Sequence, residues 1–492
     1  MTTMEDAIAF RSSTKPLMAL WSVDDAQAYG SLLWSDGKPI LTLFIEADEE
    51  IGRHFDKAKI GVLEATKPPI QATIFGTAPK FGTITLERCA RYNVRVNRNM
   101  RTGRAIYELD FLPSAIWMGA PKDAVEGRVV SVVAVDTRLV GFFGSPGLET
   151  HHSYDPKAKA AFQALDNPEC VWALHGPRQH QVELGETGWL LSLYTNSLET
   201  TSSTEGHILR STTNIALHAP KPTSISEASH HLARIEEILS TFSIEAFSFQ
   251  FERYDTDGLE SIALIWRLGE NRSLFRSPMR HQILVDLSDQ ETLTAVCKQW
   301  FLATSTISLS RWLFVRALRE TDDGLSRFVA VAQAFEVLGR EVGPHDAMPK
   351  NRLRQAVELI RETFSGKFDE GFIERVGGLI QSSNKSSYRD VLYHILSGVA
   401  QRLQLGAGED AKLFSKIVSD TRNAVIHMTD NDRGKLNEAF SRVNKLSLQL
   451  CFWFAVCQAD HMHLNIPDIG SFLFNNRNAR HGLPNEVLES EG

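Results

Sequence analysis

The chain has 492 residues, of which 43% are hydrophobic and 23% charged, which is ordinary for a globular protein and predicts more than one domain. Its formal net charge of −8 argues against a protein that coats nucleic acid. The acidic N-terminal sequence and the lack of a long apolar run predict a cytoplasmic protein without a membrane segment.

Residues 1–220 are predicted to form a β-rich domain. The segments Ser31–Trp34 and Ile40–Ile45 flank Asp36-Gly37, which is a strong hairpin signal. Strands are also expected at Gln71–Phe75, Thr83–Leu86, Arg128–Val135, Val140–Phe143, Trp189–Tyr194 and Ile208–Leu217. This pattern of short strands predicts an antiparallel sandwich or irregular barrel.

Residues 221–287 are expected to continue the N-terminal region as an α/β segment. Apolar residues recur at helical spacing from Ser224 to Ser243. Two strands, Phe247–Tyr254 and Ile262–Trp266, follow and are joined through Asp257-Gly258.

Residues 288–465 are predicted to be an all-helical bundle, because the hydrophobic period changes to 3.6 and remains there. The expected helices are 290–304, 307–319, 325–342, 351–363, 369–382, 387–403, 409–427 and 433–458. Residues 466–492 are expected to form an irregular tail. The fold class is therefore α+β, with a β-rich N-terminal region followed by a helical bundle.

No metal or cofactor is expected. The five cysteines are scattered without a CxxC pair, which favours buried free thiols over disulfides or a zinc site. The sequence also lacks a Walker loop and a GxGxxG motif, so it offers no sign of P-loop nucleotide hydrolysis.

The candidate catalytic pair is Arg422 and His427, in the segment Arg422-Asn423-Ala424-Val425-Ile426-His427. RNA carries its own nucleophile, the 2′-hydroxyl. Histidine can transfer protons near neutral pH, and the arginine fork matches phosphate oxygens. This pair is therefore suited to metal-free RNA cleavage that leaves a 2′,3′-cyclic phosphate and a 5′-hydroxyl. The competing interpretation is a surface arginine and a histidine beside a helix C-terminus.

The two side chains would lie about 140° apart on one straight helix, so they could not grip one atom together. Two arrangements would resolve this. In the first, the helix ends near Ile426, which places His427 on the following turn. In the second, two protomers face each other and pool their residues.

An Arg-Asn-x-x-x-His segment inside a helical bundle resembles the HEPN superfamily, and the longer match is to the ApeA-like HEPN proteins. This chain is similar to them in its β-rich N-terminal region, including Gly76 and Gly82 before Thr83–Leu86. It is also similar in carrying Glu336 on an early bundle helix ahead of the Arg422–His427 segment.

The resemblance implies a ribonuclease of abortive-infection anti-phage defence. It implies a homodimer through the helical domain, with the site at the subunit interface. The N-terminal region would restrain the nuclease or sense infection, with a phage-derived protein as a trigger. Transfer RNA is a plausible substrate by the same analogy.

Three further residues are site candidates. Asn423 could position the scissile phosphate, and Glu336 could face the same cavity and hold Arg422. Asp420 could orient His427. For Asp420 and Glu336, a solvated helix surface is the competing interpretation.

Two other protein classes remain open. The helical domain could be a non-catalytic HEPN scaffold that binds RNA, a nucleotide or a partner protein without cutting RNA. The other class is a carbohydrate- or peptide-binding β module with a helical oligomerisation domain. In such a protein, the side chains of Arg422 and His427 would neither converge within a protomer nor meet across a dimer.

Overall fold

The structure of the chain is a computed structural model. The structure describes residues 10, 13, 15–23, 26–35, 38–46, 71–79, 81–98, 105–119, 122–136, 138–143, 148–152, 170–174, 180–203, 206–249, 251–265, 282–320, 323–342, 349–383, 386–402, 408–426, 433–466 and 469.

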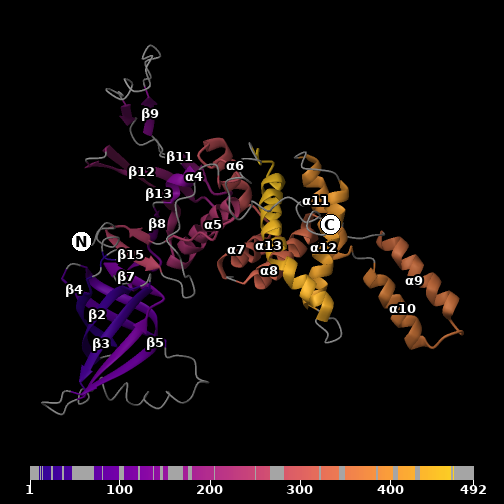
Figure 1. The fold of residues 1–492 in the computed structure, drawn as a ribbon, viewed down its shortest axis with the longest axis horizontal. Coiled ribbons are helices and arrows are strands. Elements are labelled where there is room, and N and C mark those ends of the chain that lie inside the picture. Colours follow the sequence, from indigo (N-terminus) through magenta and orange to yellow (C-terminus); the bar gives the residue numbers. More distant parts are fainter. Residues whose placement is uncertain are drawn as a thin grey trace. The chain divides into compact units, whose positions relative to one another are not determined.

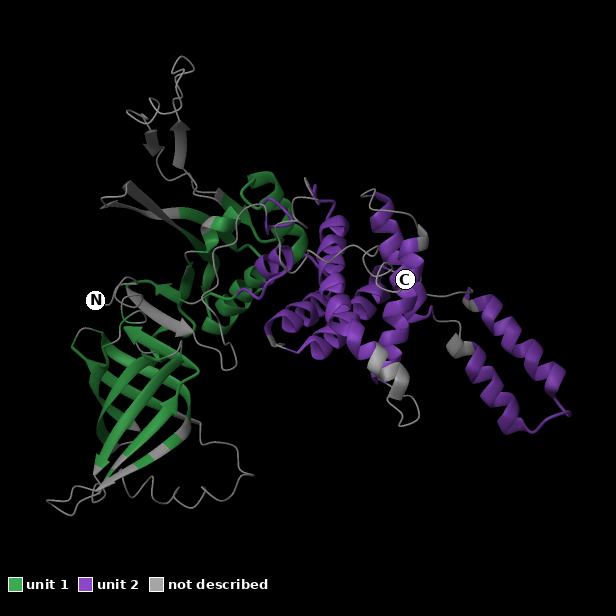
Figure 2. Ribbon diagram, viewed as in Figure 1, with its two compact units in different colours: residues 1–236, 248–278, 287–301 green, residues 237–247, 279–286, 302–492 purple. Residues whose placement is uncertain are grey.

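The chain divides into two compact units, coloured separately in Figure 2. Unit 1 comprises residues 1–236, 248–278 and 287–301, and unit 2 comprises residues 237–247, 279–286 and 302–492.

Unit 1 contains the strands and the helices that pack with them (Figure 1). Its strands are β1 (Leu17–Val23), β2 (Ala26–Ser35), β3 (Lys38–Glu46), β4 (Gln71–Ala78), β5 (Gly82–Arg98), β6 (Ala105–Leu112), β7 (Ala115–Gly119), β8 (Val129–Val135), β9 (Leu148–His152), β10 (Cys170–Leu174), β11 (His180–Glu183), β12 (Leu190–Ser203), β13 (Gly206–Thr223), β14 (Phe251–Thr256) and β15 (Leu259–Ile265). Its helices are α3 (Lys122–Val125), α4 (Leu139–Phe143), α6 (Gln290–Phe301) and the first part of α5 (Ile225–Ser243).

The first six strands close into a barrel. The strand order is β5-β4-β1-β2-β3-β6, and β6 pairs back onto β5. Alternate residues of each strand point inward, as a two-residue period requires. On β3, for example, Leu41, Leu43 and Ile45 are buried while Phe44 is exposed. The structure thus confirms the β-rich N-terminal region and selects the barrel over the sandwich.

Trp21 fills the barrel interior, with its side chain fully buried. It fits because the two strands that pair with β1, namely β4 and β2, carry glycine beside it. A Cβ atom on Gly76 would lie 2.4 Å from the Trp21 ring, and one on Gly30 would lie 2.9 Å from it. Both distances are shorter than packed carbon atoms allow, so these two positions require glycine.

Strand β5 links the barrel to a second, open sheet. Its first residues pair with β7, and its later residues pair with β6. Arg88, between these two parts of β5, has a φ of 47°, and the register of the pairing with β6 shifts between Arg91 and Asn93. Such bulges bend a strand and increase its twist. Beyond β7, the open sheet continues in the order β15-β14-β8-β13-β12-β11.

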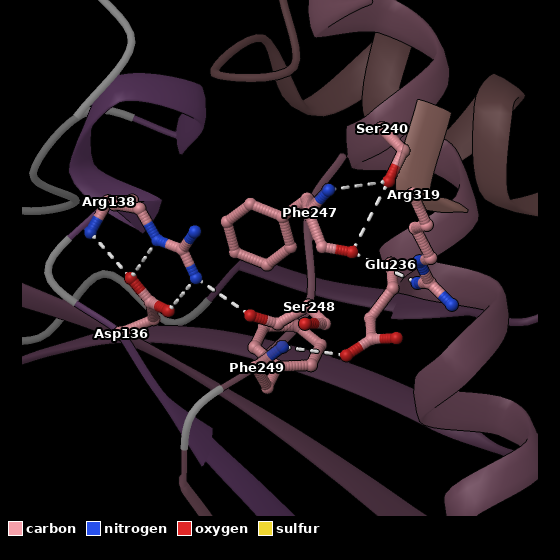
Figure 3. A network of polar contacts seen from close by, with 8 residues as sticks. All are labelled: Asp136, Arg138, Glu236, Ser240, Phe247, Ser248, Phe249 and Arg319. Atoms are coloured by element: carbon pink, nitrogen blue, oxygen red, sulfur yellow. Dashed lines mark hydrogen bonds and ion pairs between the residues drawn. The ribbon is translucent and has the colours of Figure 1, made fainter. Parts of the chain in front are cut away.

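The prediction of a strand at Val140–Phe143 is wrong, because residues 139–143 form the helix α4. The cause is the preceding turn, drawn in Figure 3. The Asp136 carboxylate accepts hydrogen bonds from the Arg138 backbone N–H at 2.9 Å and from its guanidinium at 2.8 Å and 2.5 Å. The same guanidinium donates to the Ser248 carbonyl at 2.7 Å. These bonds turn the chain out of β8, and the β propensity of the next four residues is overridden.

A histidine lies in an aromatic cluster of unit 1. His231 on α5 is 8% exposed, and its ring lies 4.5 Å from that of Trp189 and 5.6 Å from that of Phe301. Burial, assisted by the nearby His230, lowers the pKa of His231 from 6.5 to about 4. His231 is therefore neutral at physiological pH.

Unit 2 contains the helical region predicted from the 3.6-residue period. Its helices are α7 (Ser305–Glu320), α8 (Gly324–Val342), α9 (Lys350–Phe364), α10 (Glu370–Ser383), α11 (Tyr388–Arg402), α12 (Gly408–Ile426) and α13 (Arg433–His461). The order of a β region followed by a helical region confirms the predicted fold class.

The core of unit 2 lies between α7, α8 and α13. Phe314 and Phe454 stack at 4.5 Å, and Phe335 meets Phe454 edge-on at 5.4 Å. All three side chains are fully buried. Residues 449–459 of α13 are buried on every side, so this helix is the centre of the bundle.

Unit 2 also stabilises the segment that follows α5. The Phe247 N–H donates to the Ser240 hydroxyl oxygen at 2.9 Å, and the Phe247 carbonyl accepts from Arg319 of α7 at 3.0 Å (Figure 3). These bonds satisfy the backbone groups of a segment outside any strand or helix, as burial requires.

Helices α9 and α10 pack side by side as a hairpin (Figure 1). The chain turns at Gly366, whose φ of 73° favours glycine. A ladder of rings, Phe364, Phe368 and Phe372, runs across the turn with centroid spacings of 5.2 Å and 5.1 Å. Phe368 and Phe372 are largely exposed.

Within the described residues, no helix combines the length and the apolarity needed to cross a membrane.

Candidate functional site

The candidate site begins with Arg422 on α12. This helix buries Phe414, Val418 and Val425 along one side, which fixes its rotation in the bundle. Arg422 lies beside that buried side, and its side chain is 19% exposed. The guanidinium is therefore held at the border between the core and solvent.

Glu336 on α8 forms an ion pair with Arg422. The distance from Arg422 Nη2 to Glu336 Oε2 is 2.5 Å, although 86 residues separate the two in sequence. The other oxygen of Glu336 lies 3.4 Å from Nη2 of Arg340, which is 70% exposed. Glu336 thus places a negative charge between Arg422, which borders the core, and Arg340, which faces solvent.

Tyr388, the first residue of α11, covers the Arg422 guanidinium. The central carbon of the guanidinium lies 4.8 Å from the centre of the tyrosine ring, within the range of a cation–π contact. Ser387 determines where α11 begins: its hydroxyl oxygen accepts the Asp390 N–H at 3.2 Å and its hydroxyl donates to the Asp390 carboxylate at 2.6 Å. This reciprocal cap fixes Tyr388 in the first turn.

Close packing of α8 and α11 brings Glu336 and Tyr388 together. A Cβ atom on Gly339 would lie only 2.0 Å from a methyl carbon of Val391. Gly339 lies about one helical turn after Glu336, and Val391 lies about one turn after Tyr388. The glycine therefore sets the separation of the two helices next to the site.

The other predicted site residues are placed differently. Asn423 and Asp420 are exposed on α12, and neither makes a contact that joins it to Arg422. His427 follows α12 and lies outside the described residues. The roles assigned to Asn423, Asp420 and His427 therefore remain predictions.

The arrangement around Arg422 suits the binding of an anion. Glu336 holds one edge of the guanidinium and Tyr388 covers one face, while Arg422 Nε is buried and has no hydrogen-bond partner in the described part of the chain. A phosphate could accept hydrogen bonds from such a fork in a bidentate manner. A second anion would compete with Glu336 for the same donors.

A cavity of about 420 Å³ opens elsewhere in unit 2, between α8, α11 and α13. Its lining includes His394, Arg402 and His461, but not Arg422, Glu336 or Tyr388. Among the described residues, no group of three or more His, Cys, Asp or Glu is placed to hold a metal ion.

Sequence reasoning did not identify Tyr388. The Ser387-x-x-Asp390 capping pattern was visible in the sequence and fixes the start of α11. The stacking of the Tyr388 ring on Arg422, however, depends on the packing between α11 and α12, which no local pattern encodes.

In comparisons with known proteins, the family model described as Apea-like HEPN matches residues 329–465. The matched segment contains Glu336, Tyr388, Arg422 and His427. No curated protein and no solved structure matches the chain.

Proposed function

Residues 329–465 of this chain are an Apea-like HEPN domain, and on that premise we propose that the chain is a metal-independent endoribonuclease of anti-phage, abortive-infection defence. The observation that carries the proposal is the placement of Arg422. Glu336 and Tyr388 hold its guanidinium in place. Arg422 itself lies near the end of α12, and His427 follows that helix in the sequence.

In the proposed reaction, the RNA 2′-oxygen attacks the adjacent phosphorus. His427 removes the proton of the 2′-hydroxyl, the new 2′-oxygen–phosphorus bond forms, and the bond from phosphorus to the 5′-oxygen breaks. The 5′-oxygen takes up a proton as it leaves, so the products are a 2′,3′-cyclic phosphate and a 5′-hydroxyl. Arg422 stabilises the charge that develops on the phosphate oxygens, and Asn423 positions the phosphate.

We propose a homodimer through the helical domain as the active form. A dimer supplies two copies of His427, one for each of the two proton transfers. It also removes the difficulty that Arg422 and His427 point in different directions on one straight helix. RNA is the substrate, and transfer RNA is the first class to test.

We further propose that the N-terminal region restrains the nuclease and responds to a phage-derived protein. The outer face of the barrel supports this role, because it exposes a row of large apolar side chains. Phe44 pairs with Tyr29, and Tyr29 pairs with Leu20, across three neighbouring strands. Tyr29 is 71% exposed. A contiguous exposed apolar row of this kind is typical of a protein-binding surface.

The proposal is tested by incubating purified full-length protein with total RNA in EDTA and analysing the product ends. Wild-type protein is expected to leave cyclic-phosphate ends. Arg422→Ala and His427→Ala are expected to leave the RNA intact while remaining folded, as circular dichroism would show. Lys416→Ala, an exposed cation on the same helix, is the matched control and should cleave like wild type.

A trigger requirement is tested by repeating the assay with lysate of phage-infected cells. If wild-type protein binds RNA but never cuts it in either assay, the domain is a non-catalytic scaffold and the nuclease proposal is wrong.

A further inference from the structure

Tyr388 is a half-buried aromatic residue whose hydroxyl lies on its buried side. The hydroxyl oxygen is inaccessible to solvent and has no hydrogen-bond partner within the described residues. Burial raises the pKa of Tyr388, so the group stays protonated and uncharged. Leaving a buried hydroxyl unpaired destabilises the folded state. What the fold uses at this position is therefore the ring.

The ring and Glu336 restrain the Arg422 guanidinium in different directions. A carboxylate hydrogen-bonds in the plane of the guanidinium, whereas an aromatic ring covers one of its faces. A phosphate approaching Arg422 competes with Glu336 for the in-plane donors. The face contact with Tyr388 does not compete, so it can persist while an anion is exchanged at the edge.

We propose that Tyr388 is a positioning residue of the Arg422 site, with its ring holding the guanidinium plane in the orientation that meets the RNA phosphate. This inference rests on the proposed ribonuclease activity, and it adds a residue from a third helix, α11, to the site. Tyr388 acts through Arg422 and not on the RNA itself.

The inference is tested with Tyr388→Leu, which removes the ring, and Tyr388→Phe, which keeps it. The RNA-cleavage kcat of Tyr388→Leu is expected to fall at least about tenfold, because a misplaced catalytic group loses its alignment. Its KM is expected to change less than kcat. Tyr388→Phe should retain wild-type kcat and melt at or above the wild-type temperature. Tyr393→Leu, an exposed tyrosine on the same helix, is the matched control.

A second measurement does not depend on activity. The Arg422 guanidinium lies over the tyrosine ring, so its Nε–H proton is expected to show an upfield ring-current shift in NMR spectra. The shift should persist in Tyr388→Phe and disappear in Tyr388→Leu. If Tyr388→Leu does not fold, Tyr388→Met replaces it, since methionine adapts to irregular core gaps.

The outcomes separate the two proposals. Equal kcat values for wild type and a folded Tyr388→Leu, with Arg422→Ala inactive in the same assay, overturn the positioning role alone. Loss of activity in Tyr388→Phe also overturns it, because the hydroxyl would then be the functional group. If wild type does not cleave RNA at all, the proposed function fails, and a ring-current shift that is absent from wild type overturns the contact between Tyr388 and Arg422.

Discussion

Arg422 combines three properties that lysine cannot reproduce together. Its fork reaches the Glu336 carboxylate, its flat face meets Tyr388, and its Nε remains buried beside them. A lysine ammonium is a compact point charge that neither stacks on a ring nor binds phosphate in a bidentate manner.

Arg422→Lys is therefore expected to lower RNA-cleavage kcat about 100-fold or more, the usual effect of losing a group that stabilises transition-state charge. Initial rates at saturating RNA would measure it, with Lys416→Arg as the control for a charge-conserving exchange on the same helix. A rate for Arg422→Lys within a few-fold of wild type would mean that Arg422 supplies charge alone.

At the residue scale, Arg422 and Glu336 could be predicted as site residues from their residue types and from the resemblance of their positions to those in ApeA-like HEPN proteins. The structure brings these two into contact. Tyr388 was not predicted, because the contact of its ring with Arg422 depends on how the consecutive helices α11 and α12 pack against each other. His427, Asn423 and Asp420 stay predictions, and experiments on variants will decide their roles.

The helices from α5 to α13 were predicted within a few residues of their bounds, because buried apolar side chains at a 3.6-residue period leave a clear pattern. The bounds of the strands were harder to predict. β5 has 17 residues, yet only Thr83–Leu86 was predicted, because its later residues include arginines and asparagines. Those residues are held in the strand by pairing with β6. At α4, the Asp136–Arg138 turn overrode β propensity. This turn also depends on the bond from Arg138 to the Ser248 carbonyl, 110 residues away, which a local pattern does not register.

At the element scale, the spacing of α8 and α11 depends on Gly339. Gly339→Ala is expected to push Val391 away and to lower the free energy of unfolding by about 1–3 kcal/mol, the usual cost of overpacking. RNA cleavage should fall as well, because Glu336 and Tyr388 move apart. Chemical denaturation and cleavage rates would measure the two effects.

The matched control is Gly378→Ala on α10, where an added Cβ atom meets no other atom within 4 Å. Adding Val391→Ala to Gly339→Ala should restore much of both losses, because it removes the methyl group in the way. Failure of that second substitution to compensate would show that the contact between the two helices does not set the site geometry.

At the scale of the whole molecule, stability should depend on pH through His231. The unfolded chain takes up a proton near pH 6.5, whereas the folded pKa is about 4. Above pH 6.5 both states are neutral. As the pH falls from about 6.5 to about 4, the unfolded state binds the proton first, so the free energy of unfolding decreases and then levels off.

Thermal unfolding of unit 1 in the full-length protein, followed from pH 7.5 to pH 4, would measure this dependence. His231→Phe should flatten the curve between pH 6.5 and 4, since phenylalanine does not titrate. His218→Gln, which alters an exposed histidine on β13, should leave the wild-type slope unchanged. An unaltered slope in His231→Phe would show that other groups cause the acid sensitivity.

The closed barrel also affects the tendency of this protein to associate with other copies of itself through unpaired strand edges. An open sheet has two terminal strands, and each offers unpaired backbone groups on which another molecule can polymerise. Here β6 returns to β5, so the strand order of the long sheet has one terminal strand among the described residues, β11. That strand has four residues, and α6 packs against it. The long sheet therefore offers few unpaired backbone groups onto which the strands of a second copy could pair.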